Sequence, residues 1–388
     1  DFVACDDGVH VTANRRLNPP SMAGVSWFWT HDYRGLYMPL SYTLFAGEAT
    51  LARYTPEAGP PQLRPWVFHI GNLLLHALCA AVVYVLAMEL VADRLGATFA
   101  GLVFALHPLQ TETVAWISMT PGLLAALGGL IALWLYARAC RSEAGDATAL
   151  GEAAYVTRRA RRTYLLATLA LACALLAKPT AAAVPLMAGV LRFVWLARPW
   201  RSGWLGLGNW LALAAALAIT TSRLQRAATI ADVAPLASRP LIAADALSFY
   251  VQKLFVPLGL TIDYGRAPRI VLAEASHVGS WVPIAALALA LLLLPVGRRV
   301  RAAALLSLVA LGPVLGFIPF GFQEISTVAD RYFYLAMLGP ALVVAVLVAR
   351  FRAVWLRSVC AAAIVVLAAL SARQGQHWRD SSTLVAHG

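Results

Sequence analysis

Apolar residues in this chain gather into long blocks, and polar residues gather in the connections between them. The ten longest apolar runs are 67–92, 96–107, 120–137, 164–177, 180–197, 204–221, 281–296, 302–318, 334–349 and 354–371. A helix needs about 20 mostly apolar residues to cross a bilayer, and several runs are shorter, which leaves their ends open. The pattern predicts an all-α polytopic membrane protein with about ten visible transmembrane helices.

The composition supports this class of protein. Of the 388 residues, 60% are hydrophobic and 13% are charged, and the mean hydropathy is +0.70. A soluble domain needs more polar surface than this, so the composition assigns most of the chain to lipid. The five cysteines show no metal-type spacing, and at least three lie in apolar runs, so a disulfide framework is not predicted.

The net charge of +12 is divided unevenly between the two sets of connections. One set carries 16 basic and five acidic residues, and the other carries 15 basic and 14 acidic residues. Arginine concentrated in the short loops of one side is the positive-inside pattern, so this side is predicted to be cytoplasmic. The charge therefore indicates topology and contact with anionic lipid headgroups, and it does not indicate a nucleic-acid partner.

The whole chain, 1–388, is predicted to form one transmembrane domain with two long outer segments. The first extracytoplasmic loop is 1–66, and the second outer segment is 222–280. Within the second, "DALSFYVQKLFVPLGLTIDYG" is too polar to span and too apolar for a free loop, which predicts an interfacial helix. The chain opens on a polar outer segment without a signal peptide, so we expect a spanning helix to precede it.

Ionisable residues are concentrated near the outer ends of the apolar runs. Those that converge on this side are Asp6, Asp7, His107, Glu112, Lys178 and Arg331. Ionisable groups at membrane depth are costly and usually face a cavity or a partner. Their convergence predicts a functional site at the outer face.

Simpler interpretations stay open for these residues. Asp6 and Asp7 also fit solvated loop acids, and Lys178 fits a residue whose long stem reaches the interface. His107 also fits a cap on the backbone that the following proline interrupts. Each of these readings would make the residue structural.

A row of polar residues marks one predicted helix, in "WVFHIGNLLLHAL". His69, Asn72 and His76 are spaced i, i+3 and i+7 and share one face. Hydrogen bonds to neighbouring helices fit this row better than metal ligation, because no ligand spacing is recognisable. Asp330 and Arg331 fit a local ion pair at a helix entrance. No glycine loop for phosphate and no nucleophile elbow is present, so ATP-driven transport is not predicted.

Several motifs, taken in order, resemble one known family. The opening "FVACDDGVHVTANRRL" has the spacing of its first outer loop, with Asp6, Asp7 and Asn14 at matching positions. The later stretches are "YMPLSY", "FHIGNLLLHAL", "FALHPLQTETVAWIS", "LLAKPTAAAVPL", "YVQKLFVPLGLTIDY", "ADRYFYLAMLGP" and "HWRDSSTLVAHG". The set resembles bacterial relatives of the transmembrane and tetratricopeptide-repeat protein O-mannosyltransferases, which have the GT-C fold. The resemblance covers nearly the whole chain and implies a GT-C-like helical bundle whose extracytoplasmic loops carry short helices.

Two features depart from the family's pattern. Met38 stands where the family often has arginine, which removes one contact to a phosphate or sugar. The chain ends where tetratricopeptide repeats would begin. The resemblance therefore implies that the first helix and the C-terminal repeats are absent from this sequence.

The resemblance implies a membrane glycosyltransferase that moves a sugar from a polyprenyl phosphate to an acceptor hydroxyl, with serine or threonine of a protein expected. The reaction would run at the periplasmic face of a bacterial inner membrane and invert the sugar. Asp7 or Asp6 would be the base, since a positioned carboxylate can take the acceptor's proton. Arg331, Lys178 and His107 would bind the donor phosphate, which gains charge as it leaves.

Four further residues, Glu112, His69, Tyr37 and Asn14, are assigned to the sugar, the acceptor or the orientation of the loop. The reaction requires no cofactor, and a divalent metal is compatible with it but is not predicted. Expected partners are the lipid-linked sugar, an acceptor protein or glycan, membrane lipids and other subunits of a membrane complex. One alternative is a non-catalytic scaffold subunit with the same fold. A transporter fits less well, because the charges lie at one face and no internal repeat is visible.

Overall fold

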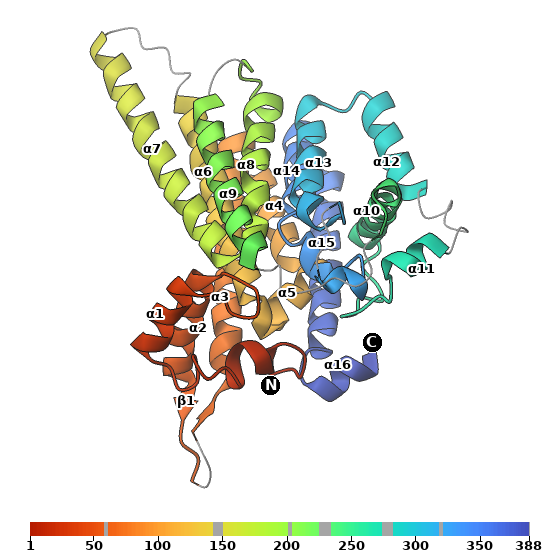
Figure 1. Cartoon of the computed structure of the whole chain (residues 1–388). Coiled ribbons are helices and arrows are strands. Elements are labelled where there is room, and N and C mark those ends of the chain that lie inside the picture. Colours follow the sequence, from red (N-terminus) through yellow and green to blue (C-terminus); the bar gives the residue numbers. More distant parts are fainter. Residues whose placement is uncertain are drawn as a thin grey trace.

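Helices form almost all of the regular structure in the computed structural model (Figure 1). The structure describes residues 1–57, 61–142, 150–200, 204–224, 234–273, 282–317 and 321–387. Within these ranges the only paired strands are β1 (Arg53–Tyr54) and β2 (Gln62–Leu63), which form a short antiparallel hairpin. The predicted all-α class is confirmed at this level.

Four helices in the described ranges are long and apolar enough to cross a membrane. They lie in α3 (Pro65–Val91), α6 (Thr120–Ser142), α7 (Leu150–Ala177) and α15 (Val354–Gln376). The chain is therefore a membrane protein by the length and composition of its helices. At 1.5 Å per residue, α3 is about 40 Å long, which exceeds the roughly 30 Å of a bilayer core.

The remaining predicted runs also contain helix, whose apolar parts are shorter than those of the four long helices. These are α4 (Arg94–Leu106), α8 (Val184–Gly189), α9 (Trp204–Leu224), α12 (Val282–Leu293), α13 (Arg298–Leu311) and α14 (Leu338–Phe351). The run 180–197 is a chain of three pieces, η4 (Pro179–Ala183), α8 and η5 (Val190–Trp195), and Pro179 and Pro185 stand in the first turns of η4 and α8. Their length alone does not establish that they span.

Short helices gather at one end of the bundle, the lower end in Figure 1, together with both chain ends. They are η1 (Gly8–Thr12), α1 (Met22–Thr30), α2 (Pro39–Ala52), α5 (Thr111–Ala115) and α16 (Ser381–His387). A further amphipathic helix, α10 (Arg239–Phe255), forms in the segment that the sequence assigned to the interface, followed by α11 (Pro268–Ala273). Residues 225–233 and 274–281, which contain much of the remaining 222–280 segment, lie outside the described residues.

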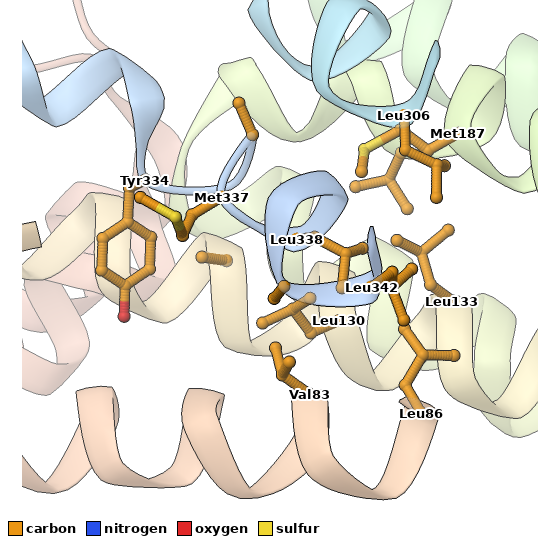
Figure 2. Close-up of a cluster of buried hydrophobic side chains, with 14 of the residues drawn as sticks. Val83, Leu86, Leu130, Leu133, Met187, Leu306, Tyr334, Met337, Leu338 and Leu342 are labelled. Carbon is orange, nitrogen blue, oxygen red and sulfur yellow. The ribbon is translucent and has the colours of Figure 1, made fainter. Parts of the chain in front are cut away.

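The core lies where α3, α6, α13 and α14 meet (Figure 2). Leu86 of α3, Leu133 of α6 and Leu342 of α14 are completely buried there. Small residues allow the close approach, since a Cβ on Gly339 would lie 2.3 Å from the carbonyl oxygen of Ala303. Such contacts stabilise helix pairs in lipid, where burial of apolar surface supplies little driving force.

Candidate functional site

The acid pair of the sequence separates into two different environments. Asp7 is 1% exposed, and its carboxylate accepts hydrogen bonds from Val3 N (3.0 Å), Ser118 N (2.9 Å) and Ser118 Oγ (2.6 Å). Burial raises the pKa of Asp7, while the hydrogen bonds from Ser118 and Val3 act in the opposite direction. Asp7 therefore ties the N-terminal segment to the turn that precedes α6.

Asp6, by contrast, is exposed. Within the described ranges its carboxylate has no hydrogen-bond partner. Its negative charge acts on Lys178 and on His10, which places the three groups close together. Of the two acids, Asp6 is the one whose oxygens are available to a ligand.

Lys178 lies between α7 and η4, beside a cavity of about 170 Å³. The cavity is lined by His10, Met38, Ser118, Pro121, Lys178 and Thr180, together with two apolar neighbours. Burial, with a further contribution from the charge of Arg331, lowers the pKa of Lys178 to about 8. In the part of the chain that the structure describes, its ammonium group makes no hydrogen bond, so its donors face the cavity unused.

Arg331 forms a buried ion pair with Glu112. The guanidinium Nη1 lies 2.5 Å from Glu112 Oε1, and Arg331 N donates to Glu112 Oε2 at 2.7 Å. The Arg331 side chain is 8% exposed, and its Cζ lies 4.1 Å from the ring centroid of Phe322. The positive charge still reaches Lys178 and Cys5, the residue before Asp6. Arg331 thus supplies a fixed cation near the cavity, held by Glu112.

The local Asp330–Arg331 ion pair that the sequence suggested is not formed. Asp330 is 2% exposed and accepts a hydrogen bond from the Tyr264 hydroxyl at 2.7 Å instead. Burial and the charge of Glu112 raise the pKa of Asp330 well above its ordinary value. Adjacent residues in this turn point to different partners, which sequence order alone does not reveal.

His107 contacts backbone with both ring nitrogens. It is 2% exposed, its Nε2 lies 3.0 Å from Leu254 O, and its Nδ1 accepts a hydrogen bond from Leu109 N at 3.2 Å. Burial lowers its pKa to about 4, so the ring is neutral at pH 7. Both ring nitrogens are committed to backbone, which leaves none for a phosphate.

The polar row on α3 makes contacts between helices, as the non-metal interpretation predicted. Asn72 Nδ2 donates to Trp116 O at 3.1 Å, and His76 Nδ1 lies 2.7 Å from the Tyr334 hydroxyl. His69 Nε2 lies 3.2 Å from Asp1 O. The row holds α3 to the outer turns and to the N-terminus. No group of three metal-ligating side chains occurs in the described ranges.

Two of the residues assigned to the sugar or the loop organise backbone. Tyr37 donates its hydroxyl to Trp29 O at 3.0 Å. Asn14 is fully buried, donates to His10 O at 3.2 Å and accepts from Arg16 N at 3.0 Å. Both side chains contact backbone of the N-terminal segment, and their assignment to the sugar, the acceptor or the loop stays a prediction.

Sequence reasoning missed His10 and Ser118 as parts of the site. His10 lines the cavity and shares a 2.8 Å hydrogen bond between its Nδ1 and the Tyr42 hydroxyl. Ser118 also lines the cavity and holds Asp7. A signal for Ser118 was present, because it closes the "FALHPLQTETVAWIS" motif, whereas nothing in the pattern distinguished His10.

The arrangement brings an available carboxylate, an ammonium group and a buried ion pair to one end of the bundle. A carboxylate can accept a proton, and an ammonium group with free donors can bind an anion. Such a set can place a proton acceptor and an anion-binding group on either side of one reacting atom.

Comparison with known proteins finds relatives of one kind. The chain is 30% identical over 154 residues to protein O-mannosyl-transferase TMTC2 from mouse and to the human protein of that name. It is 39% identical over 83 residues to protein O-mannosyl-transferase Tmtc2 from Drosophila melanogaster.

These matches are partial in both directions. The TMTC2 match covers 38% of this chain but 17% of each mammalian relative, and the Drosophila match covers 21% of this chain and 9% of that relative. No family model and no solved structure matches the chain. The similarity supports a relationship to glycosyltransferases. It does not by itself establish the fold family or the reaction.

Proposed function

We propose that this chain is the membrane part of a GT-C-type glycosyltransferase that uses a polyprenyl-phosphate sugar. The sugar goes to an acceptor hydroxyl, with serine or threonine of a protein expected, at the periplasmic face of a bacterial inner membrane. Two findings support the proposal: similarity to protein O-mannosyl-transferases, and a helical chain with apolar runs at ten positions. In the proposed topology the chain crosses the membrane about ten times. Four of these crossings are made by the long helices, and the others by shorter or interrupted helices.

One observation carries the proposal. The ammonium group of Lys178 lines a cavity at one end of the bundle, and the charge of the exposed Asp6 carboxylate acts on that ammonium group. The buried Glu112–Arg331 pair holds a guanidinium group, with its compensating carboxylate, whose charge acts on Lys178. A lipid-linked donor brings its own leaving group, so the chain needs an anion-binding group and a base but no nucleotide site.

Asp6 acts as the base in the proposed reaction. The acceptor oxygen attacks the anomeric carbon while its proton passes to the Asp6 carboxylate. The bond from that carbon to the phosphate oxygen breaks, and its electron pair leaves with the lipid phosphate. Attack from the face opposite the phosphate inverts the anomeric carbon.

Lys178 is the direct phosphate ligand in this scheme, because its donors are free of partners in the described structure. Arg331 contributes charge from behind, since Glu112 already holds one edge of its guanidinium. Asp7 and Ser118 position Asp6 by fixing the start of η1. The favourable electrostatics are preorganised, so little reorganisation is needed as the phosphate gains charge.

The proposal is tested by transfer of labelled mannose from a polyprenyl-phosphate donor to a serine- and threonine-containing peptide in proteoliposomes. Asp6→Asn should reduce the rate about 10²–10⁴-fold, the usual contribution of a positioned base. Asp32→Asn is the matched control. Asp32 lies in the same outer loop, and its carboxylate accepts a hydrogen bond from Gly35 N within a local turn. Equal rates for Asp6→Asn and the parent protein would refute the base assignment.

One observation favours the non-catalytic scaffold as a second candidate. Met38 lines the cavity where the resemblance expects an arginine, so the cavity lacks one cation. A scaffold would leave labelled donor intact with peptide acceptor or with water, whatever residue stands at position 6. An enzyme would release lipid phosphate in the same assay.

A further inference from the structure

A second cavity lies at the opposite end of the bundle, between the end of α3 and the ends of α13 and α14. Its volume is about 510 Å³, within the range of about 300–1,000 Å³ typical of small-molecule sites. His69, whose charge acts on Asp7, and Val91, which lines this cavity, lie about 33 Å apart along α3. The two cavities are therefore separate sites.

Four arginines line this cavity, Arg298, Arg299, Arg350 and Arg352. All four are exposed, and no carboxylate of the described chain lies within ion-pair distance of them. The one acid in the lining, Asp93, is engaged elsewhere, because its Oδ2 accepts a hydrogen bond from Gly96 N at 2.7 Å and caps α4. The cavity therefore has a positive charge that the described part of the protein does not neutralise.

The backbone adds to this charge. Gly297 occupies the N-cap position of α13 and lines the cavity. Glycine has no side chain with which to cap the helix. An uncapped helix start directs free N–H groups and the positive end of its dipole outward. Cationic side chains and a helix start on one wall are together a good match for a phosphate group.

The surroundings indicate that the phosphate belongs to a lipid. Two and three residues after Arg352, Val354 is 76% exposed and Trp355 is 67% exposed at the start of α15. Within α15 only Ile364 is classed as buried, so most of this helix presents an apolar surface, and its start lies next to the arginines. An apolar surface beside a cationic cavity fits a molecule with acyl chains and an anionic headgroup, and tryptophan prefers that depth.

We propose that this arginine-lined cavity binds the phosphate headgroup of an anionic phospholipid from the leaflet on the basic side of the protein. Arg298 and Arg350 contact the phosphate from two helices, and the acyl chains rest against α15. The site is separate from the donor site and does not depend on transfer activity.

Native mass spectrometry of the purified full chain tests the proposal, with phosphatidylglycerol as the probe and phosphatidylcholine as the neutral comparison. The Arg298→Gln, Arg350→Gln double variant should bind phosphatidylglycerol about 30-fold more weakly. The matched control is Arg158→Gln, Arg159→Gln, which removes the same charge from exposed positions of α7. Its binding should change less than about threefold, because diffuse charge is screened. Equal losses in both doubles would overturn the site.

Two measurements on the unaltered chain keep the test independent of folding of the variants. A photoactivatable phosphatidylglycerol should crosslink to peptides that contain 91–93, 297–299 or 346–352. Crosslinks spread evenly over the chain would overturn the proposal. Inorganic phosphate in the millimolar range should not displace the lipid, and complete displacement would assign the cavity to a soluble anion instead.

Discussion

The two ends of the helical bundle hold their charges in opposite ways. At the outer end, Asp7 accepts three hydrogen bonds and Glu112 is paired with Arg331, all with little exposure to solvent. At the basic end, Arg298 and Arg350 stand exposed around a cavity without a carboxylate partner in the described ranges. At the outer end Asp7, Glu112 and Arg331 are fixed within the protein, while Asp6 and Lys178 make no side-chain hydrogen bond in the described ranges. At the basic end the arginines are left to the surroundings.

This difference follows from where each charge sits. A buried charge is costly unless a partner and hydrogen bonds compensate for it, so the outer charges are held rigidly in networks. An exposed arginine at the headgroup level keeps its hydration and needs no partner. Hydrogen-bond networks hold buried side chains in fixed positions, as a reaction requires. Unpaired charge on the surface is suited to setting the orientation of the protein in the membrane and to contacting lipid headgroups.

The largest difference in stability between the two ends is expected at the Glu112–Arg331 pair. Glu112→Ala leaves a buried guanidinium without its carboxylate, so the free energy of unfolding should fall by about 3–5 kcal/mol. Chemical unfolding in mixed micelles measures the change. The control is Glu89→Ala, whose carboxylate lies 3.6 Å from Arg141 in an exposed pair, and its effect should stay below about 1 kcal/mol. Similar effects in both variants would remove the distinction between the two ends.

Glu48 sharpens the comparison because it is a buried acid without a partner. It is 7% exposed, neither carboxylate oxygen has a hydrogen bond, and burial raises its pKa to about 8. The folded chain therefore holds a proton that the unfolded chain releases near pH 4.5. The contribution of Glu48 to stability should be fully present below pH 4.5 and should decrease by about 4 kcal/mol as the pH rises to 8.

Unfolding measured between pH 4.5 and 8 checks this prediction, with Glu48→Gln as the control. The glutamine keeps the shape without the charge, so this variant should lack Glu48's contribution to the slope. A parent protein with the same pH slope as Glu48→Gln would show that Glu48 is ionised in the folded state.

Asp7→Asn should have a smaller effect on stability. The amide keeps the size of the carboxylate, but a charge-assisted acceptor of three hydrogen bonds is lost, at about 1–3 kcal/mol. Thermal unfolding in detergent measures the loss. A variant as stable as the parent would mean that Ser118 and Val3 do not depend on the charge.

Asp6→Asn should have the smallest effect on stability, since Asp6 is exposed and forms no hydrogen bond within the described ranges. The melting temperature should be that of the parent protein in the same detergent. A clear drop would show that Asp6 is part of the Asp7 network and would weaken its assignment as an available base.

The sequence was a good guide to the elements and a poor one to the partners. Apolar runs located a helix at each expected position, because burial in lipid leaves a signal in residue type alone. The pattern also predicted a helix in the segment where α10 forms, and the position of that helix at the membrane interface stays a prediction. The pattern did not reveal that the run 180–197 is divided, nor how many helices are long enough to cross.

The candidate site was predictable only as a region. Charges at the outer ends of the runs predicted a site at one end of the bundle, and that site stays a prediction. Arg331 pairs with Glu112, 219 positions away in the chain, rather than with Asp330, and no local pattern encodes that partner. The contact of His107 with Leu109 N is local and agrees with the capping interpretation that the sequence left open. The adjacent Asp6 and Asp7 look equivalent in sequence, and the fold alone makes one buried and one exposed.

A structure of the protein with a polyprenyl-phosphate sugar bound would test the proposed division of labour most directly. We predict the donor phosphate within hydrogen-bond distance of Lys178 Nζ, and the Asp6 carboxylate on the side of the anomeric carbon away from the phosphate. A donor phosphate held among the arginines at the ends of α13 and α14, with Lys178 and Asp6 both untouched, would contradict it.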